Sequence, residues 1–276
     1  MERVMLLSFS CLLLLSLAGL VKPTEQVVHG SRSLNSFLEK NIFVLAGQSN
    51  MSGRGGVVNQ TWDRIVPPEC QPNPSILRLN SQLKWEKARE PLHFDIDVTQ
   101  TCGIGPGMSF ANTIRDLDPS IGIVGLVPCA VGGYHGTKIS EWEQGTSLYN
   151  QLIERTKSSV RKGGKIRAIL WFQGESDTVT SEDAEMYSKK LKKLILNLRA
   201  DLQLLRLPFI QVALASGQGH FLGTVRKSQL ELNLPNVRCV DAYGVPLSTD
   251  YVHLTTPAEV RVGKLLAKAF HSFNSA

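Results

Sequence analysis

Charge, aromatic residues and long apolar runs are all scarce in this sequence. Charged residues make up 20% and aromatic residues 7% of its 276 residues, and the one long apolar run lies at the N-terminus. With 42% hydrophobic residues, this is the composition of a globular chain, which excludes disordered, collagen-like and polytopic membrane proteins. A chain of this length buries roughly 70–75% of its unfolded surface, so its core needs neither disulfides nor metals.

Motifs for metals, nucleotides and nucleic acids are also missing. No C-x-x-C occurs, which argues against a zinc cluster, and neither phosphate-binding pattern, G-x-x-x-x-G-K-[ST] or G-x-G-x-x-G, is present. The formal charge of +6 is mildly basic and comes without the interleaved aromatic residues of a DNA- or RNA-binding protein. We therefore expect no metal, no cofactor and no nucleic-acid partner, and the sequence leaves the oligomeric state open.

Residues 1–24 are expected to be a cleaved signal peptide. Arg3 supplies the charged start, an apolar run centred on Leu12–Leu15 follows, and small residues such as Ala18 come next. The mature protein would then be secreted or extracellular, with the cell wall as one destination, and would have no membrane contact. The alternative is an uncleaved signal anchor that tethers the protein to a membrane, because the run approaches the length that spans a bilayer.

Secretion would place the remaining four cysteines in an oxidising compartment, where they can form up to two disulfides. Cys70 and Cys102 lie in loop-like sequence and are the preferred pair. Cys129 and Cys239 end apolar, strand-like runs and are expected to be buried thiols.

Short apolar runs alternate with helical periodicity along the rest of the chain. The runs are rich in branched or aromatic residues and bounded by Gly or Pro, as strands are. They cover Asn41–Ala46, Ile121–Val127, Ile166–Phe172, Pro208–Ala215 and Val237–Val240. Amphipathic helices are predicted over Met108–Leu117, Ser147–Val160 and Pro257–Phe270, and a longer one begins near Glu182 with an apolar stripe that reaches Leu205. For the last helix, Thr256 is the expected N-cap and Glu259 completes a capping box.

This alternation predicts an α/β protein with a three-layer, doubly wound, flavodoxin-like fold and a five-stranded parallel sheet. Residues 25–276 would form a single domain, in which residues 51–106 are an irregular insertion beside the site. Ligands of such sheets bind beyond the carboxyl ends of the strands, so the residues directly after each strand are the candidates for chemistry.

Three strand ends carry residues suited to acyl transfer. The first strand is followed by Gly47-Gln48-Ser49, a glycine-flanked turn that exposes a serine hydroxyl and its N–H. Gly132 and Gly133, after the second strand, let backbone N–H groups approach a ligand closely. Gln173, after the third strand, can aim its side-chain amide at a developing negative charge. Ser49, Gly132, Gly133 and Gln173 are thus predicted to form an oxyanion hole.

The segment Asp250-Tyr251-Val252-His253 is expected to supply His253 as the base for Ser49, with Asp250 as the partner of the imidazole. Asp250 can hold the Nδ1–H tautomer of His253 and leave Nε2 free to take the serine proton. His93, with an aspartate nearby, is the rival base, but it lies within the insertion rather than at a strand end. Glu175 is the alternative partner for His253.

Four blocks, GQSNMSGRGG, PCAVGGYHGTKISEW, WFQGESD and DYVH, occur in this order along the chain. They resemble the motifs of the SGNH-type hydrolases, most closely the carbohydrate esterase family 6 or sialate O-acetylesterase-like branch. General GDSL lipases have Asp where Gln48 stands and Asn where Gln173 stands, and both departures fit the acetylesterase branch. The resemblance implies a carboxylic ester hydrolase that uses Ser49, His253 and Asp250 to remove acetyl groups from O-acetylated carbohydrate, with cell-wall polysaccharide as the expected substrate.

Trp142, Arg54 and Glu175 are the candidate substrate-binding residues. Trp142 can stack on a sugar ring, although packing in the core is its other interpretation. Glu175 is also placed to support Gln173 or Arg54. Two other functions fit the same residues: a polysaccharide O-acetyltransferase with the same triad, and a catalytically silent carbohydrate-binding module, which would have no use for a nucleophile.

Overall fold

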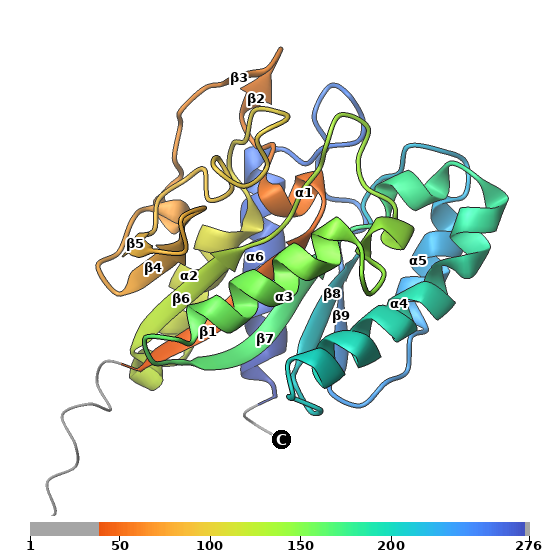
Figure 1. Ribbon diagram of the computed structural model, residues 1–276. Coiled ribbons are helices and arrows are strands. Elements are labelled where there is room, and N and C mark those ends of the chain that lie inside the picture. The colour runs from red at the N-terminus through yellow and green to blue at the C-terminus, as the bar shows by residue number, and fades with distance from the viewer. Residues whose placement is uncertain (1–38, 274–276) are drawn as a thin grey trace, which may run out of the picture. The chain divides into compact units, whose positions relative to one another are not determined.

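The computed structural model describes residues 39–273 (Figure 1). Within them, seven strands form one sheet in the order β5-β4-β6-β1-β7-β8-β9, and all neighbours are parallel except β4 and β5. The strands are β1 (Lys40–Gly47), β4 (Ile76–Leu79), β5 (Trp85–Lys87), β6 (Ile123–Pro128), β7 (Lys165–Phe172), β8 (Phe209–Ala213) and β9 (Val237–Asp241). The expected signal peptide, residues 1–24, lies outside the described residues, so it and the single domain from 25 to 276 stay predictions.

The five predicted strands are present as β6, β1, β7, β8 and β9, in the 2-1-3-4-5 order of flavodoxin-like sheets. The count of five is wrong, because β4 and β5 come from the segment 51–106 that the sequence predicts to be irregular. β4 is four residues long and carries Arg78 in its middle. Arg78 is fully buried, and neither apolar alternation nor a continuous apolar run marks such a strand.

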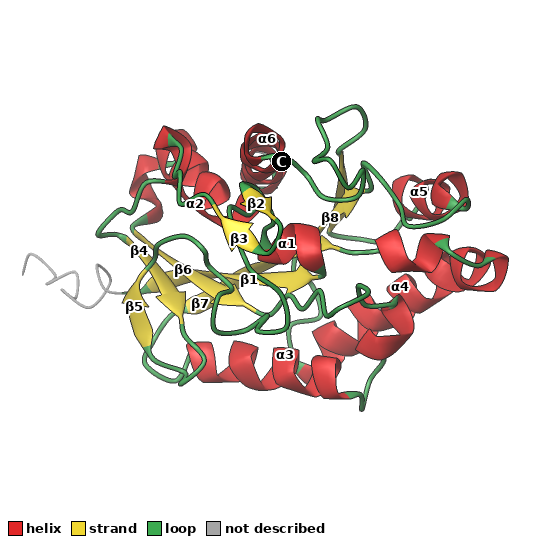
Figure 2. Ribbon diagram, turned by 90° about the horizontal axis from the view of Figure 1, so that it is seen from above, coloured by secondary structure: helices red, strands yellow, loops and turns green. Residues whose placement is uncertain are grey.

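Helices cover both faces of the sheet, α2 and α6 on one and α3 and α4 on the other, which gives the predicted three layers (Figure 2). The α-helices are α1 (Ser49–Ser52), α2 (Pro106–Leu117), α3 (Ser147–Ser159), α4 (Ser181–Asp201), α5 (Leu222–Leu230) and α6 (Thr256–His271). The small elements are a hairpin of β2 (Val57–Val58) and β3 (Thr61–Trp62), and the 3-10 helices η2 (Pro68–Cys70), η3 (Pro119–Ile121), η4 (Ile139–Trp142) and η5 (Glu175–Thr178).

Four of these helices follow the predicted ranges, and α5 is an addition that weak apolar periodicity did not reveal. α4 ends at Asp201, before the end of the predicted stripe, and Leu205 is 75% exposed. The N-cap residue of α6 is Thr255, one residue before the predicted Thr256. Glu259, which lies within α6, is fully buried and does not close a capping box.

Aromatic side chains fix the sheet to the helices on both faces. Phe43 of β1 packs edge-on against Phe110 of α2 and Phe270 of α6, each at 4.8 Å between ring centroids. On the other face, Trp171 of β7 packs edge-on against Trp142 at 5.2 Å. Each such pair contributes about 0.5–1.5 kcal/mol beyond its buried area. The two central strands, β1 and β7, are therefore rigid supports for the residues that follow them.

All four cysteines among the described residues are free. The predicted disulfide between Cys70 and Cys102 is therefore wrong: both side chains are buried, and the Cys102 thiol instead donates to the Asp97 carbonyl at 3.5 Å. Cys129 is buried as expected, and Cys239 is partly exposed. Between residues 39 and 273, no helix has the length and apolar content needed to cross a membrane.

Candidate active site

The sharp turn after β1 places α1 at the carboxyl edge of the sheet (Figure 1), and Ser49 is the first residue of α1. Gly47 has φ of +132°, and a Cβ there would lie 2.0 Å from the Phe172 carbonyl oxygen of β7. Only glycine therefore lets β1 end this close to β7. The next N–H, that of Gln48, donates to the same carbonyl at 2.9 Å, and α1 then begins at Ser49.

Ser49, His253 and Asp250 are hydrogen-bonded in series. His253 Nε2 lies 2.9 Å from Ser49 Oγ, and His253 Nδ1 lies 2.6 Å from Asp250 Oδ2. The other Asp250 oxygen accepts the N–H groups of Val252 at 2.9 Å and His253 at 2.8 Å. Burial alone would raise the pKa of Asp250, but these hydrogen bonds and the imidazole outweigh it and lower the pKa. An ionised Asp250 can thus hold the Nδ1–H tautomer and leave Nε2 as a base.

The two rival assignments do not fit this geometry. His93 is 1% exposed, and burial lowers its pKa to about 3, so it is neutral and out of reach of a substrate. Glu175 is also 1% exposed, and its Oε1 accepts a hydrogen bond from Asn50 Nδ2 at 2.6 Å rather than from His253. Asp250 is therefore the carboxylate that contacts the imidazole.

A cavity of about 320 Å³ opens over the Ser49–His253 pair. Its wall consists mainly of side-chain amides, hydroxyls and glycine backbone. The lining residues are Ser49, Arg54, Val57, Asn59, Gln60, Gln100, Thr101, Gly132, Gly133, Tyr134, Gly136, Gln218, Asp250 and His253. Such a wall offers hydrogen bonds to a ligand that is rich in hydroxyl groups.

Two backbone N–H groups are available to an oxyanion beside Ser49. The N–H of Ser49 is at the first position of α1, where no intrahelical acceptor exists. Gly132 packs so closely on Ser49 that a Cβ at Gly132 would lie 2.9 Å from Ser49 Cβ, but the Gly132 N–H donates to Asp97 Oδ2 at 3.0 Å. The N–H of Gly133, which lines the cavity, has no acceptor within residues 39–273. Of the two predicted glycines, Gly133 is thus the available donor.

Gln173 lies behind the cavity rather than in it. Its side chain is fully buried, and Nε2 donates to the Thr137 carbonyl at 2.6 Å, to Asp177 Oδ2 at 2.7 Å and to Gln48 Oε1 at 3.2 Å. Its oxygen accepts from the Tyr187 hydroxyl at 3.1 Å. The predicted role as a direct oxyanion donor is therefore corrected: a strand-end amide faces whichever side offers it partners, and here these are inside the protein.

Of the three predicted substrate-binding residues, only Arg54 reaches the cavity wall. Its Nη2 is held by Asp97 Oδ2 at 2.6 Å. Trp142 is fully buried and donates its indole N–H to Thr137 Oγ1 at 3.2 Å, so the stacking prediction is wrong and the packing interpretation holds. Glu175 is buried under the turn, and burial raises its pKa to about 7 in spite of the hydrogen bond from Asn50.

Two further residues, Asn50 and Asp97, belong to the site but were not predicted from the sequence. Asn50 Oδ1 accepts the N–H of Leu254 at 3.0 Å, so it ties the serine turn to the loop that carries His253. Its position directly after Ser49 was the available signal. Asp97 had none, because its partners are distant in sequence. No cluster of His, Cys, Asp or Glu with metal-binding geometry occurs in the described part of the chain.

A serine, a histidine and an aspartate in this order at the carboxyl edge of a parallel sheet form the arrangement of an esterase-type acyl-transfer site. Comparisons with known proteins identify the family. Residues 39–272 match the family described as carbohydrate esterase, sialic acid-specific acetylesterase, and the chain belongs to this family. The match agrees with the resemblance that the four sequence blocks indicate.

Relatives support this assignment. The probable carbohydrate esterase At4g34215 of Arabidopsis thaliana is 53% identical over 84% of this chain and 90% of its own length. The X-ray structure of this Arabidopsis protein has a TM-score of 0.81, with 52% identity, over 85% of this chain and 98% of that one. The structure of NanS has a TM-score of 0.64 at 18% identity, over 86% of this chain and 98% of that one, which shows the fold.

Proposed function

We propose that this protein is a secreted serine esterase that removes O-acetyl groups from carbohydrate through an acetyl-enzyme. The observation that supports this most directly is the chain of hydrogen bonds from Asp250 through His253 to Ser49, which ends in an open, polar cavity. Family membership supports the carbohydrate ester as the substrate. The N-terminal signal pattern supports secretion, and cell-wall polysaccharide is the substrate class that we propose.

In the proposed reaction, Ser49 Oγ attacks the ester carbonyl while His253 Nε2 takes its proton. The negative charge that develops on the carbonyl oxygen is bound by the N–H groups of Ser49 and Gly133. His253 then protonates the leaving sugar hydroxyl, which leaves an acetyl group on Ser49. Water, deprotonated by the same imidazole, attacks this acetyl ester and releases acetate. Asp250 stabilises the imidazolium in both steps.

The test is turnover of a small soluble acetyl ester, followed by a panel of acetylated wall polysaccharides. We expect acetate release by the wild type and none above background by Ser49→Ala. Ser120→Ala is the matched control, because Ser120 is exposed and its hydroxyl donates to Asp118 away from the cavity. Full activity of Ser49→Ala would refute the proposed nucleophile. A wild type that releases acetate from no ester would refute the function itself.

The transferase alternative is tested in the same assay by adding unacetylated sugar. An esterase converts every acetyl group that the ester loses into acetate, whereas a transferase passes acetyl to the added sugar, so its yield of acetate per ester consumed falls. No contact within residues 39–273 favours the transferase or a silent binding module.

A further inference from the structure

Asp97 is a buried carboxylate to which the reaction above assigns no role. It lies in the insertion, is 1% exposed, and its Oδ2 accepts three hydrogen bonds. The donors are Ser52 Oγ at 2.7 Å, Arg54 Nη2 at 2.6 Å and the Gly132 N–H at 3.0 Å. Ser52 and Arg54 follow β1, whereas Gly132 follows β6. One carboxylate oxygen therefore connects the two strand ends that flank the cavity.

This connection begins where backbone pairing between the two strand ends stops. The last such hydrogen bond runs from the Val131 N–H to the Gly47 carbonyl at 3.0 Å. The next N–H, that of Gly132, points to Asp97, and the one after it belongs to Gly133, which lines the cavity. Gly133 also has φ of +62°, a conformation that lets successive N–H groups point in different directions without strain in glycine.

We propose that Asp97 is the positioning residue of the oxyanion hole. Asp97 holds Gly132 against the serine turn. The N–H groups of Gly133 and Ser49 thereby both point at the carbonyl oxygen of the reacting ester. Asp97 touches no substrate and acts through Gly132. This inference rests on the proposed esterase function, because only a reaction that develops an oxyanion needs two aligned donors.

The surroundings of Asp97 keep its charge compatible with this role. Burial raises its pKa, but the charge and hydrogen bonds of Arg54, with those from Ser52 and Gly132, outweigh burial and lower the pKa. Asp97 therefore remains ionised and can accept all three hydrogen bonds at neutral pH. The Arg54 guanidinium pairs with this negative charge and also lines the cavity, so it offsets the repulsion that the oxyanion would otherwise meet.

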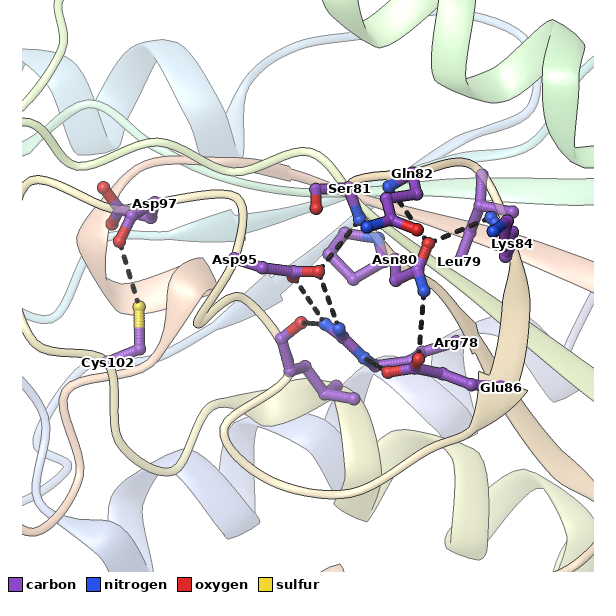
Figure 3. A network of polar contacts seen from close by, with 12 residues as sticks. Arg78, Leu79, Asn80, Ser81, Gln82, Lys84, Glu86, Asp95, Asp97 and Cys102 are labelled. Carbon is purple, nitrogen blue, oxygen red and sulfur yellow. Dashed lines mark hydrogen bonds and ion pairs between the residues drawn. The ribbon is translucent and has the colours of Figure 1, made fainter.

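The insertion provides a matched control two residues away. Asp95 also pairs with a buried arginine: its oxygens accept from Arg78 Nη1 at 2.8 Å and Nη2 at 2.9 Å (Figure 3). It also accepts the Ser81 N–H at 2.9 Å. These partners belong to β4 and the turn after it, and none lines the cavity. Asp95→Asn thus removes a carboxylate charge from the same segment, at a residue whose partners do not line the cavity.

The experiment measures kcat and KM on a soluble acetyl ester, and inhibition by an alkylboronic acid, which forms a tetrahedral adduct with a serine hydroxyl. Active-site titration with a serine-directed phosphonate corrects for any inactive fraction. We expect Asp97→Ala to lower kcat about 100-fold, the lower end for one lost oxyanion donor, with little change in KM. Asp97→Asn should lower kcat about tenfold, because the amide oxygen can take the place of Oδ2 but is neutral and holds the Arg54 guanidinium and the other two donors more weakly.

Boronate affinity should weaken by the same factor as kcat in each Asp97 variant, while inhibition by the deacetylated product sugar stays unchanged. Asp95→Asn should lower the thermal midpoint without changing kcat or boronate affinity. If Asp97→Ala fails to fold, Asp97→Asn tests the proposal by the same three measurements: kcat, boronate affinity and inhibition by the product sugar. A folded Asp97 variant with wild-type kcat and boronate affinity would overturn the proposal. A wild type without esterase activity would instead overturn the proposed function.

Discussion

Two polar regions meet at Ser49, and they use similar residues in opposite surroundings. On the cavity side, the side chains of His253 and Asp250 are 28% and 49% exposed. Behind the serine turn, Gln173, Glu175 and Asp177 are at most 1% exposed, and they bond to backbone or to other buried side chains. The exposed region can reach a substrate, whereas the buried layer can only fix the turn that carries Ser49.

The pKa values of the carboxylates differ between the two regions in the same way. Asp250 has a lowered pKa, because two N–H groups and the imidazole outweigh its burial. Burial dominates for Glu175 and Asp177 and raises the pKa of each to about 7, although each accepts hydrogen bonds. Carboxylates on the two sides of the serine turn are thus suited to different tasks by their surroundings.

The largest difference should appear when one aspartate of each region is changed to asparagine. Asp250→Asn should lower kcat by about 10⁴, the loss that follows when the base is held in the wrong tautomer. Its unfolding free energy should stay within about 0.5 kcal/mol of the wild type, as for other exposed sites. Asp177→Asn should change kcat no more than a few-fold. Steady-state kinetics and urea unfolding check both, and equal kinetic losses would erase the distinction between the regions.

Glu175→Gln should change the pH dependence of stability. The folded pKa of Glu175 is about 7, above its ordinary value of 4.5, so the folded state binds more protons between these values. Unfolding free energy should therefore be highest below pH 4.5 and fall as pH rises to about 7, by roughly 3 kcal/mol at most. The neutral glutamine removes this loss, so the variant should be more stable than the wild type at pH 8.

Urea unfolding at pH 5 and pH 8 measures this effect. Glu154→Gln, at an exposed position in α3, is the control and should keep the wild-type pH slope. A Glu175→Gln variant with the same slope as the wild type would show that Glu175 is ionised in the folded protein.

Gln173→Leu separates support from catalysis within the buried layer. The change leaves the Thr137 carbonyl, Gln48 Oε1 and Asp177 without their common donor, which should cost about 1–3 kcal/mol of unfolding free energy. Because the amide does not face the cavity, kcat per active site should fall less than tenfold. A drop of about 10²–10³ in kcat with unchanged stability would restore Gln173 as a direct oxyanion donor.

The smallest effect is expected at the rim of the cavity. Tyr134 lines the cavity and is 73% exposed, so its ring is available to pack on a sugar. Tyr134→Ala should raise KM for an acetylated oligosaccharide a few-fold without changing kcat or stability. Tyr243→Ala removes an equally exposed ring that does not line the cavity, and it should leave KM unchanged. Equal KM values for both variants would exclude Tyr134 from substrate binding.

The sequence predicted the parts of this molecule that depend on local pattern. Apolar runs located β1, β6, β7, β8 and β9, because buried parallel strands are nearly continuous in apolar residues. The strand-end rule then selected Ser49, and the short Asp250–His253 spacing selected its partners. These residues meet in the structure because the parallel sheet brings all strand ends to one edge.

The remainder depends on contacts between distant residues. Gln173 was placed at the correct strand end, but which side its amide faces is decided by Thr137 and Asp177. The strand β4 was missed because its burial relies on the pairing of Arg78 with Asp95. Asp97 was not predicted for the same reason, because it accepts a hydrogen bond from Gly132, which lies in another segment of the chain. Arg78 and Asp97 are thus buried polar residues whose partners lie in distant parts of the sequence.

The measurement that tests the central claim most directly is the trapping of the covalent intermediate. The wild type is mixed with an acetyl ester, quenched with acid within the first turnovers and analysed by mass spectrometry of the intact protein and its peptides. The account predicts one added acetyl group, on the peptide that contains Ser49, and no adduct in Ser49→Ala. An acetyl group on a different residue, or acetate release by Ser49→Ala without any adduct, would contradict it.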